Sequence, residues 1–172
     1  MTHHDPRRSI RRLGPAVAAR SVGEASEMTS ALERRLRRVA ALSWAAPCSL
    51  VGLAIAAPLV CAGGSVRRVG HTLEIALAAT ESAVPPTLQR LRFAAITLGH
   101  VIVGRSHEVL ERLRPHERVH VAQYERLGAL FFLAYAGSSL VAWCRGGCPY
   151  RDNAFERQAF ALAADDVDAE AR

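Results

Sequence analysis

A charge-free stretch of 28 residues, 39–66, constrains this chain more than any other feature of its sequence. Four arginines between residues 34 and 38 precede the stretch, and Arg67 follows it. A helix that crosses the hydrocarbon core of a membrane takes about 20 apolar residues, and basic residues beside such a helix favour the cytoplasmic side. The sequence therefore predicts a transmembrane helix over residues 39–64 with the N-terminus in the cytoplasm. A buried core helix is the alternative interpretation of the same stretch.

The segment before this stretch is strongly basic. Residues 1–38 hold nine of the 22 basic residues of the chain, and every basic residue is an arginine. We expect a partly disordered tail with a helix that begins near Ser30, whose side chain can cap it. The net charge of +6 is compatible with nucleic-acid binding. Aromatic residues make up only 6% of the chain, however, and no known nucleic-acid-binding motif is present, so no nucleic-acid partner is expected.

The rest of the chain predicts a folded domain over residues 65–164, followed by an acidic tail at 165–172. Residues 66–76 alternate around Gly70, which predicts a β-hairpin. A second β-like run covers residues 93–103, which either align an extended peptide as an edge strand or cover the core. The expected fold class is α+β and predominantly helical.

The folded domain contains the motif His116-Glu117-Arg118-Val119-His120. On a helix, residues four apart lie on one face, so both imidazoles can bind one metal ion while Glu117 lies beside them as a general base. Pro115 suits the first turn of a helix and Gly128 suits its end, which predicts a helix of about three turns between them. The pattern is typical of zinc hydrolases.

A hydrolytic zinc ion generally has three protein ligands and an open position for water, so a third ligand is expected downstream. Glu156 is the best candidate, because it follows His120 by 36 residues, enough for one intervening helix and a turn. Asp152 or Asn153 can cap a helix that carries Glu156 in its first turns. The predicted ligands are therefore His116, His120 and Glu156, and zinc is the predicted metal.

These motifs resemble those of two groups of proteins. A glutamate ligand on a second helix after HExxH is typical of the gluzincin metallopeptidases. A family of small, uncharacterised bacterial membrane-associated proteins has the pattern GHV, HExVHVxQYExWG and YRDNPFExxA, which is similar to ITLGHV at 96–101, HERVHVAQYERLG at 116–128 and YRDNAFERQA at 150–159. The resemblance covers residues 42–160. Leu127 stands where an aromatic residue is usual, and Ala154 where a proline is usual.

The resemblance implies a minimal zincin-like core with short β-hairpins, attached to an N-terminal transmembrane helix. His116, His120 and Glu156 match the ligand positions and Glu117 matches the catalytic position. We therefore expect a membrane-anchored zinc metallopeptidase that cleaves a peptide or protein substrate near the membrane. Zinc lowers the pKa of a bound water towards 7, and Glu117 would accept its proton. The alternative is a non-catalytic membrane protein whose zinc site is structural or vestigial.

Four further residues are candidates for supporting roles. Asp152 or Asn153 could orient a ligating imidazole. Tyr124 could stabilise an oxyanion, or it could pack in the core. His100 could approach the metal, or it could be a structural histidine.

A second charge-free stretch of 18 residues, 127–144, separates the HExxH motif from Glu156 and is at the lower length limit for a membrane span. If it crossed the bilayer, the motif and Glu156 would lie on opposite sides and could not share a metal outside the membrane. We therefore expect a helix that packs against the first one or lies at the membrane interface, where Tyr135 and Trp143 are favoured. A full crossing is the alternative. The predicted location is the bacterial cell membrane, with membrane lipid as a partner and the zinc site outside the cytoplasm.

Overall fold

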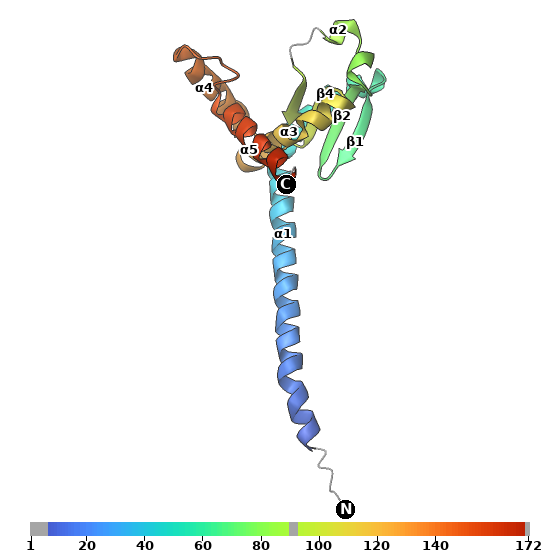
Figure 1. The fold of residues 1–172 in the computed structure, drawn as a ribbon, viewed down its shortest axis with the longest axis vertical. Coiled ribbons are helices and arrows are strands. Elements are labelled where there is room, and N and C mark those ends of the chain that lie inside the picture. Colours follow the sequence, from blue (N-terminus) through green and yellow to red (C-terminus); the bar gives the residue numbers. More distant parts are fainter. Residues whose placement is uncertain (1–6, 90–92, 171–172) are drawn as a thin grey trace, which may run out of the picture. The chain divides into compact units, whose positions relative to one another are not determined.

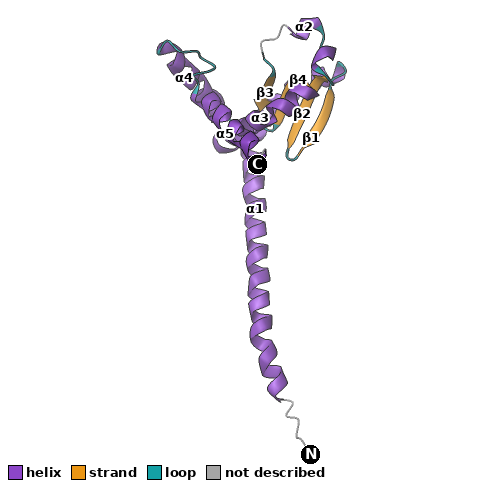
Figure 2. Cartoon of the chain, viewed as in Figure 1, coloured by secondary structure: helices purple, strands orange, loops and turns teal. Residues whose placement is uncertain are grey.

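The computed structural model has an α+β fold, which confirms the predicted fold class (Figure 1). It describes residues 7–89 and 93–170, with the backbone alone for residues 7–27, 87–88 and 166–170. The elements in chain order are α1 (Arg7–Cys61), β1 (Ser65–Val69), β2 (Thr72–Ala78), the 3-10 helix η1 (Glu81–Ala83), α2 (Pro86–Gln89), β3 (Ala95–Leu98), β4 (Val101–Ser106), α3 (His107–Leu127), α4 (Leu130–Cys144) and α5 (Ala154–Glu170). The strands lie together beside α3 (Figure 2).

The four strands form one mixed sheet in the order β1-β2-β4-β3. β1 and β2 pair antiparallel, which confirms the hairpin predicted over residues 66–76. β3 and β4 form a second hairpin, and β2 and β4 join the two hairpins as parallel neighbours. The run at 93–103 is therefore not a single strand, because the chain turns back at Gly99 and His100. Gly99 has a φ of 62°, a left-handed conformation that glycine adopts without steric penalty.

The sheet is covered on both faces. Ile75, Val101 and Val103 pack with Ala56 of α1 in one buried cluster. The alternate strand residues Ala76 and Ile102 pack with Leu110 and Val121 of α3 in another. Because successive side chains of a strand point to opposite faces, the apolar run 101–103 fills both clusters.

Helix α1 begins at Arg7, earlier than the start near Ser30 that the sequence suggests. By its internal contacts the chain divides into residues 1–40 and residues 41–172, so α1 contributes to both units. Within the second unit, small side chains spaced three or four residues apart form the buried face of α1. They are Ala45, Cys48, Gly52 and Ala56.

The backbone of α1 approaches the sheet very closely at Gly52. A Cβ atom at this position would lie 2.8 Å from the Cβ of Val101, closer than real Cβ atoms come to one another. The turn between β3 and β4 makes a second close approach, because a Cβ on Gly99 would lie 2.6 Å from the backbone nitrogen of Ser49. The apolar helix and the sheet are therefore parts of one packed unit.

The part of α1 from Met28 to Cys61 is long and apolar enough to cross a membrane. Its exposed surface carries large hydrophobic side chains, namely Leu50, Val51, Leu53, Ile55 and Val60. Among the helices that the structure describes, no other passes the same test alone; α3 and α4, which are bent by 116°, pass only when joined as one broken span. With 15 residues, α4 is about 22 Å long, shorter than the roughly 30 Å hydrocarbon core of a bilayer.

Helix α3 carries the HExxH motif and begins earlier than predicted. The side chain of Ser106 caps it by accepting a hydrogen bond from the Val109 N–H (3.2 Å). Pro115 therefore lies inside the helix, and the prediction that it occupies the first turn is wrong. Proline inside a helix removes one backbone hydrogen bond, but the packing of α3 on the sheet and on α5 compensates for this loss. The helix ends at Gly128, as predicted, with a φ of 55°.

Helix α5 returns the chain to the HExxH motif. Asn153 starts it as predicted, because its Oδ1 accepts a hydrogen bond from the Phe155 N–H (2.9 Å). The Asn153 Nδ2 atom also donates to the Tyr135 backbone oxygen (3.0 Å), which ties the start of α5 to α4. From there α5 packs against α3 (Figure 1). It continues to Glu170, so most of the acidic end has a helical backbone, and residues 171–172 lie outside the described part.

Candidate metal centre

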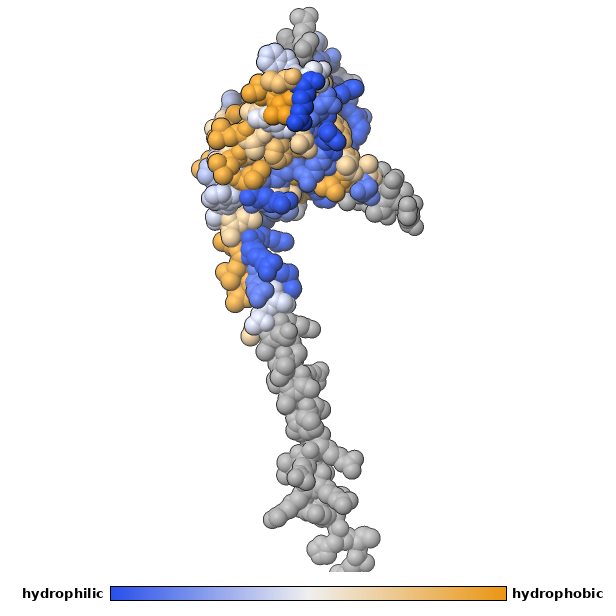
Figure 3. All heavy atoms as spheres, turned by 90° about the vertical axis from the view of Figure 1, so that its left-hand side faces the viewer, coloured by the Kyte–Doolittle hydropathy of each residue, from blue (hydrophilic) through white to orange (hydrophobic). Residues whose placement is uncertain are grey.

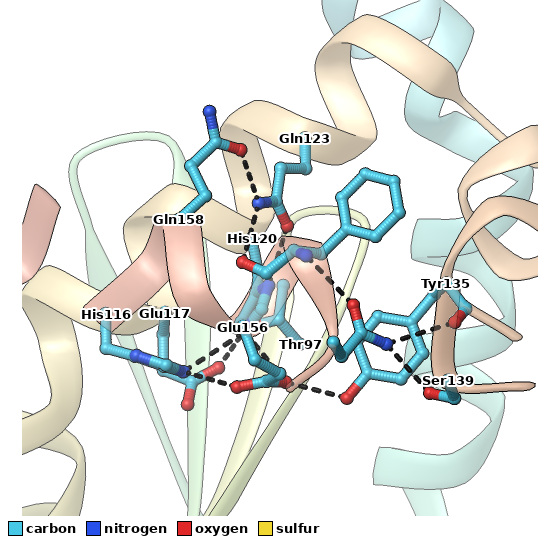
Figure 4. A network of polar contacts seen from close by, with 11 residues as sticks. Thr97, His116, Glu117, His120, Gln123, Tyr135, Ser139, Glu156 and Gln158 are labelled. Carbon is cyan, nitrogen blue, oxygen red and sulfur yellow. Dashed lines mark hydrogen bonds and ion pairs between the residues drawn. The ribbon is translucent and has the colours of Figure 1, made fainter. Parts of the chain in front are cut away.

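Three buried side chains from two helices meet inside the domain (Figure 4). His116 and His120 lie one turn apart on α3, and Glu156 lies in the first turn of α5. The two Nε2 atoms are 3.1 Å apart, and Glu156 carboxylate oxygens lie 3.3 Å from His116 Nε2 and 3.4 Å from His120 Nε2. The structure thus brings together the three side chains that the sequence suggests as ligands.

These distances suit a shared metal ion. Zinc bonds of about 2.0–2.1 Å at tetrahedral angles separate the ligand atoms by about 3.3 Å, close to all three distances. Imidazole nitrogens and carboxylate oxygens are both ligands that zinc accepts. Within the part of the chain that the structure describes, no fourth histidine, cysteine or carboxylate joins this group. A tetrahedral ion held here would have one position open to water or substrate.

Gln123 determines which ring nitrogen of His120 faces the centre. Its amide nitrogen donates to the Phe155 backbone oxygen (3.1 Å) and to Gln158 Oε1 (2.9 Å), so its own Oε1 faces His120 Nδ1 (2.8 Å) as an acceptor. His120 Nδ1 therefore carries the hydrogen, and Nε2 presents a lone pair towards Glu156. A lone pair and a carboxylate repel each other unless a metal ion or a proton lies between them. The donor set therefore fits a divalent metal ion.

The carboxylate of Glu156 is only partly satisfied by the protein. Tyr135 donates a hydrogen bond to Oε1 (2.7 Å), whereas Oε2 is buried without a hydrogen-bond partner. Burial alone would raise the pKa of Glu156, but the adjacent imidazoles of His116 and His120 and the hydrogen bond from Tyr135 outweigh burial and hold this pKa well below its usual range. Glu156 is therefore ionised near neutral pH and attracts a cation.

The pKa of His120 moves in the opposite direction. Burial opposes its protonation, but the hydrogen bonds with Glu156 and Gln123 outweigh burial and raise the pKa. Without a metal ion, a proton on His120 partly neutralises the Glu156 carboxylate. A metal ion would compete with that proton for the same nitrogen.

Glu117 lies beside the ligand group but does not belong to it. Its Oε2 accepts a hydrogen bond from Thr97 Oγ1 on β3 (2.6 Å). Glu117 and the three candidate ligands line one cavity of about 310 Å³. Apolar residues form much of the remaining wall, namely Phe93, Ile96, Leu98, Phe131 and Phe132. A positioned carboxylate in a largely apolar cavity is what a general base requires.

Two of the three tyrosines that line the cavity differ in their surroundings. Tyr124 is buried in a core cluster with Ala45 and Cys48, and its ring centroid lies 4.3 Å from that of Phe131. Its environment therefore favours the packing role. Tyr150 is half-exposed at the cavity, where partial burial and the charge of Glu156 raise its pKa to about 12. The Tyr150 hydroxyl is therefore protonated, and can donate a hydrogen bond, at neutral pH.

The structure gives Asp152, Asn153 and His100 other contacts than the sequence suggests. Asp152 does not orient an imidazole, because its Oδ2 accepts a hydrogen bond from the Cys148 N–H (2.6 Å). Asn153 is used in capping α5 and in binding α4. The orienting contact with His120 comes from Gln123 instead. His100 does not join the ligand group of His116 but a different one.

Three residues of the site are not among those that the sequence predicts. Gln123 follows His120 by three positions, so helical spacing could have revealed it. Thr97 and Tyr135 lie 20 and 21 residues from their carboxylate partners, and no local pattern connects them. Only the packing of β3 and α4 against the site brings these two residues to it.

The chain matches no family model, no curated protein and no solved structure. The resemblance carried by the three motifs therefore stays an expectation.

Proposed function

We propose that the protein is a membrane-associated zinc metallopeptidase with a gluzincin-like site. The observation that carries the proposal is the convergence of His116, His120 and Glu156 in a cavity that Glu117 also lines. These three side chains would hold a zinc ion, which when bound supplies Lewis-acid activation of water and of the scissile carbonyl.

Glu117 is the proposed general base. Its carboxylate accepts a proton from the attacking water and returns that proton to the leaving amine, so one residue serves both steps. The hydrogen bond from Thr97 fixes one carboxylate oxygen and leaves the other free for the water. Tyr150 is the proposed donor to the developing oxyanion, because its hydroxyl is protonated and borders the cavity.

The edge strand β3 is the proposed binding site for an extended substrate. In the described sheet β3 pairs only with β4, so its other edge is free to pair with a peptide backbone. Three consecutive β3 residues, Ile96, Thr97 and Leu98, also line the cavity. A peptide bound along β3 would place one of its side chains against the aromatic wall of the cavity. The site therefore suits substrates with apolar side chains.

The proposed location is the bacterial membrane, with the N-terminus in the cytoplasm and the zinc site outside it. The arginines at residues 34–38 before the apolar part of α1 support this orientation. Helix α4 also exposes large apolar residues, namely Leu130, Phe132, Leu133, Leu140, Val141 and Trp143. Figure 3 views the molecule from the side of α4 and shows hydrophobic residues over much of that face. These features support contact of the domain with lipid.

A structural zinc site is the competing function. It would hold α3 to α5 without catalysis, and it would normally have a fourth protein ligand. The cavity beside the ligand group and the separate carboxylate of Glu117 favour the hydrolytic proposal.

The test uses the full-length protein in detergent micelles with zinc and a library of internally quenched peptides rich in apolar residues. Glu117→Gln should abolish cleavage while zinc binding at His116 and His120 persists, and Glu156→Ala should weaken that binding severely. Glu111→Gln, on the exposed surface of the same helix, is the matched control and should change neither. Zinc binding with no cleavage of any peptide by the unmutated protein would favour the structural alternative.

A further inference from the structure

A second group of metal-ligand side chains lies outside the candidate metal centre. His71, His100 and Glu125 offer donor atoms that all lie within 4.8 Å of one another. His120 and Glu125 are both on α3, but five positions separate them by about 7.5 Å along the helix and about 140° around it. The second group therefore lies on a different face of α3 from the candidate metal centre.

The two histidines occupy equivalent positions in the two hairpins. The turn sequences are Val69-Gly70-His71-Thr72 and Leu98-Gly99-His100-Val101, and both glycines have a φ of 62°. Because β2 and β4 are parallel neighbours, the turns that precede them lie at the same end of the sheet. The Leu73 N–H donates to the His100 backbone oxygen (2.9 Å), which holds the second turn beside the start of β2.

Hydrogen bonds of Ser49 orient the His100 ring. The Ser49 hydroxyl donates to the Ala45 backbone oxygen (3.1 Å) and accepts from the His100 N–H (3.0 Å). With its own hydrogen used, Ser49 Oγ can only accept from His100 Nδ1, 3.4 Å away. His100 Nε2 then presents a lone pair to Glu125 Oε1 at 3.1 Å. Two acceptors at this distance require a cation or a proton between them.

We propose that His71, His100 and Glu125 form a second zinc site. Glu125 Oε1 lies 3.1 Å from His100 Nε2 and 3.6 Å from His71 Nε2, on either side of the roughly 3.3 Å expected between tetrahedral zinc ligands. Two imidazoles and a carboxylate form a ligand set that zinc accepts. The ion would fasten both hairpin turns to the end of α3. The proposal does not depend on peptidase activity.

Two of the three proposed ligands are accessible from solution. His100 is buried and already oriented, whereas His71 is 49% exposed and Glu125 31% exposed at their side chains. Zinc from solution can therefore meet the two accessible ligands first and the fixed imidazole last. Because His71 lies in an exposed turn, its replacement leaves the core of the domain intact.

The experiment is a zinc titration of metal-stripped full-length protein in detergent micelles, with bound zinc counted by elemental analysis. The unmutated protein should bind one zinc more per chain than His71→Ala, and Glu125→Ala should lose the same equivalent. His116→Ala should lose the zinc bound at the candidate metal centre. The double variant His71→Ala/His116→Ala should therefore lose the zinc of both sites. His107→Gln is the matched control, because His107 pairs with Ser65 outside both groups (2.7 Å) and should keep the full stoichiometry.

Equal zinc content in the unmutated protein, His71→Ala and Glu125→Ala would overturn the proposal and show that a proton joins His100 to Glu125. Circular dichroism of each variant separates loss of a site from loss of fold. X-ray absorption of His116→Ala loaded with zinc gives a second measurement, in which two imidazoles should surround the remaining ion. If the peptidase proposal is wrong, the protein should cleave no peptide but should still bind the same number of zinc ions.

Discussion

Gln123 acts on the metal centre without being one of its ligands. It holds the hydrogen of His120 on Nδ1 and so directs the Nε2 lone pair to the place where the three candidate ligands meet. Tyr135 orients Glu156 in a similar way, by donating a hydrogen bond to one of its two carboxylate oxygens. At the scale of single residues, the geometry of the centre therefore depends on neighbours that orient the ligands.

Replacing Gln123 by leucine should weaken zinc binding by roughly 10- to 100-fold, the usual effect of losing an orienting neighbour. The His120 Nδ1 hydrogen would then be buried without an acceptor. Zinc affinity can be measured by competition with a coloured chelator. Gln158→Leu is the control, because Gln158 contacts Gln123 on the side away from His120. Equal effects of the two changes would contradict the orienting role.

The metal-free protein should lose stability as the pH rises above about 6.5. The pKa of His120 is raised in the folded state, so its protonation stabilises the fold below its usual value of 6.5 and this contribution is lost as the pH passes the raised value. Glu156 has a lowered pKa, so its contribution is present throughout this range and is lost only at low pH.

Chemical unfolding in chelator at several pH values measures this dependence. With zinc bound, stability should instead increase with pH, because zinc competes with protons for the histidines and binds better at higher pH. His120→Gln should remove much of the pH dependence of the metal-free protein. A metal-free protein that becomes steadily more stable as the pH rises above 6.5 would contradict the raised pKa of His120.

At the scale of elements, two arginine–carboxylate pairs connect the sheet to α3. Arg114 binds Glu74 of β2 through two hydrogen bonds of 2.8 and 3.0 Å, and the Glu74 side chain is only 2% exposed. Arg67 of β1 binds Glu111 at 3.2 Å, and both side chains are more than half exposed. Both pairs join α3 to the sheet, one through β2 and the other through β1, but they differ in burial.

Replacing Arg114 by methionine should lower the free energy of unfolding by about 3–5 kcal/mol, because it leaves the Glu74 carboxylate buried without its partner. Arg67→Met should change stability by no more than about 1 kcal/mol, as is usual for an exposed pair. Urea unfolding in detergent, followed by circular dichroism, compares the two variants. Equal losses would show that burial does not distinguish the pairs.

At the scale of the whole molecule, apolar surface is concentrated on two helices. The Met28–Cys61 part of α1 and the helix α4 both expose large hydrophobic side chains, including one tryptophan each, Trp44 and Trp143. Such surfaces are costly in water and are stabilised by lipid. The packing of α1 on the sheet means that a membrane in contact with this helix also lies close to the domain.

Lipid contact of α4 can be tested with Trp143 as the only tryptophan, in the Trp44→Phe variant. In vesicles, brominated lipids should quench Trp143 fluorescence strongly, and a water-soluble quencher should have less effect, because interfacial tryptophans lie at the level of the lipid headgroups. The control is Val66→Trp in a chain that lacks the other two tryptophans. Position 66 is exposed on β1, so this tryptophan should respond mainly to the soluble quencher. The reverse pattern would contradict an interfacial α4.

Features that depend on local spacing along the chain can be predicted without the fold. Residues four apart face the same way on any helix, so the HExxH motif predicts two adjacent imidazoles before any packing is known. The capping ability of Asn153 and the glycine in the first hairpin turn are equally local. Pro115 lies inside α3 rather than in its first turn, because the local cap at Ser106 starts the helix earlier and the packing of α3 offsets the hydrogen bond that proline removes.

The distant residues that complete the site depend on long-range packing. Thr97 reaches Glu117 from β3, Tyr135 reaches Glu156 from α4, and Ser49 orients His100 across 51 residues of sequence. The apolar stretch in α1 has the length of a membrane span, but the close approach of its backbone to the sheet appears only in the fold. The physical reason is that helical spacing is set by backbone hydrogen bonds between near neighbours, whereas these contacts depend on how whole elements pack.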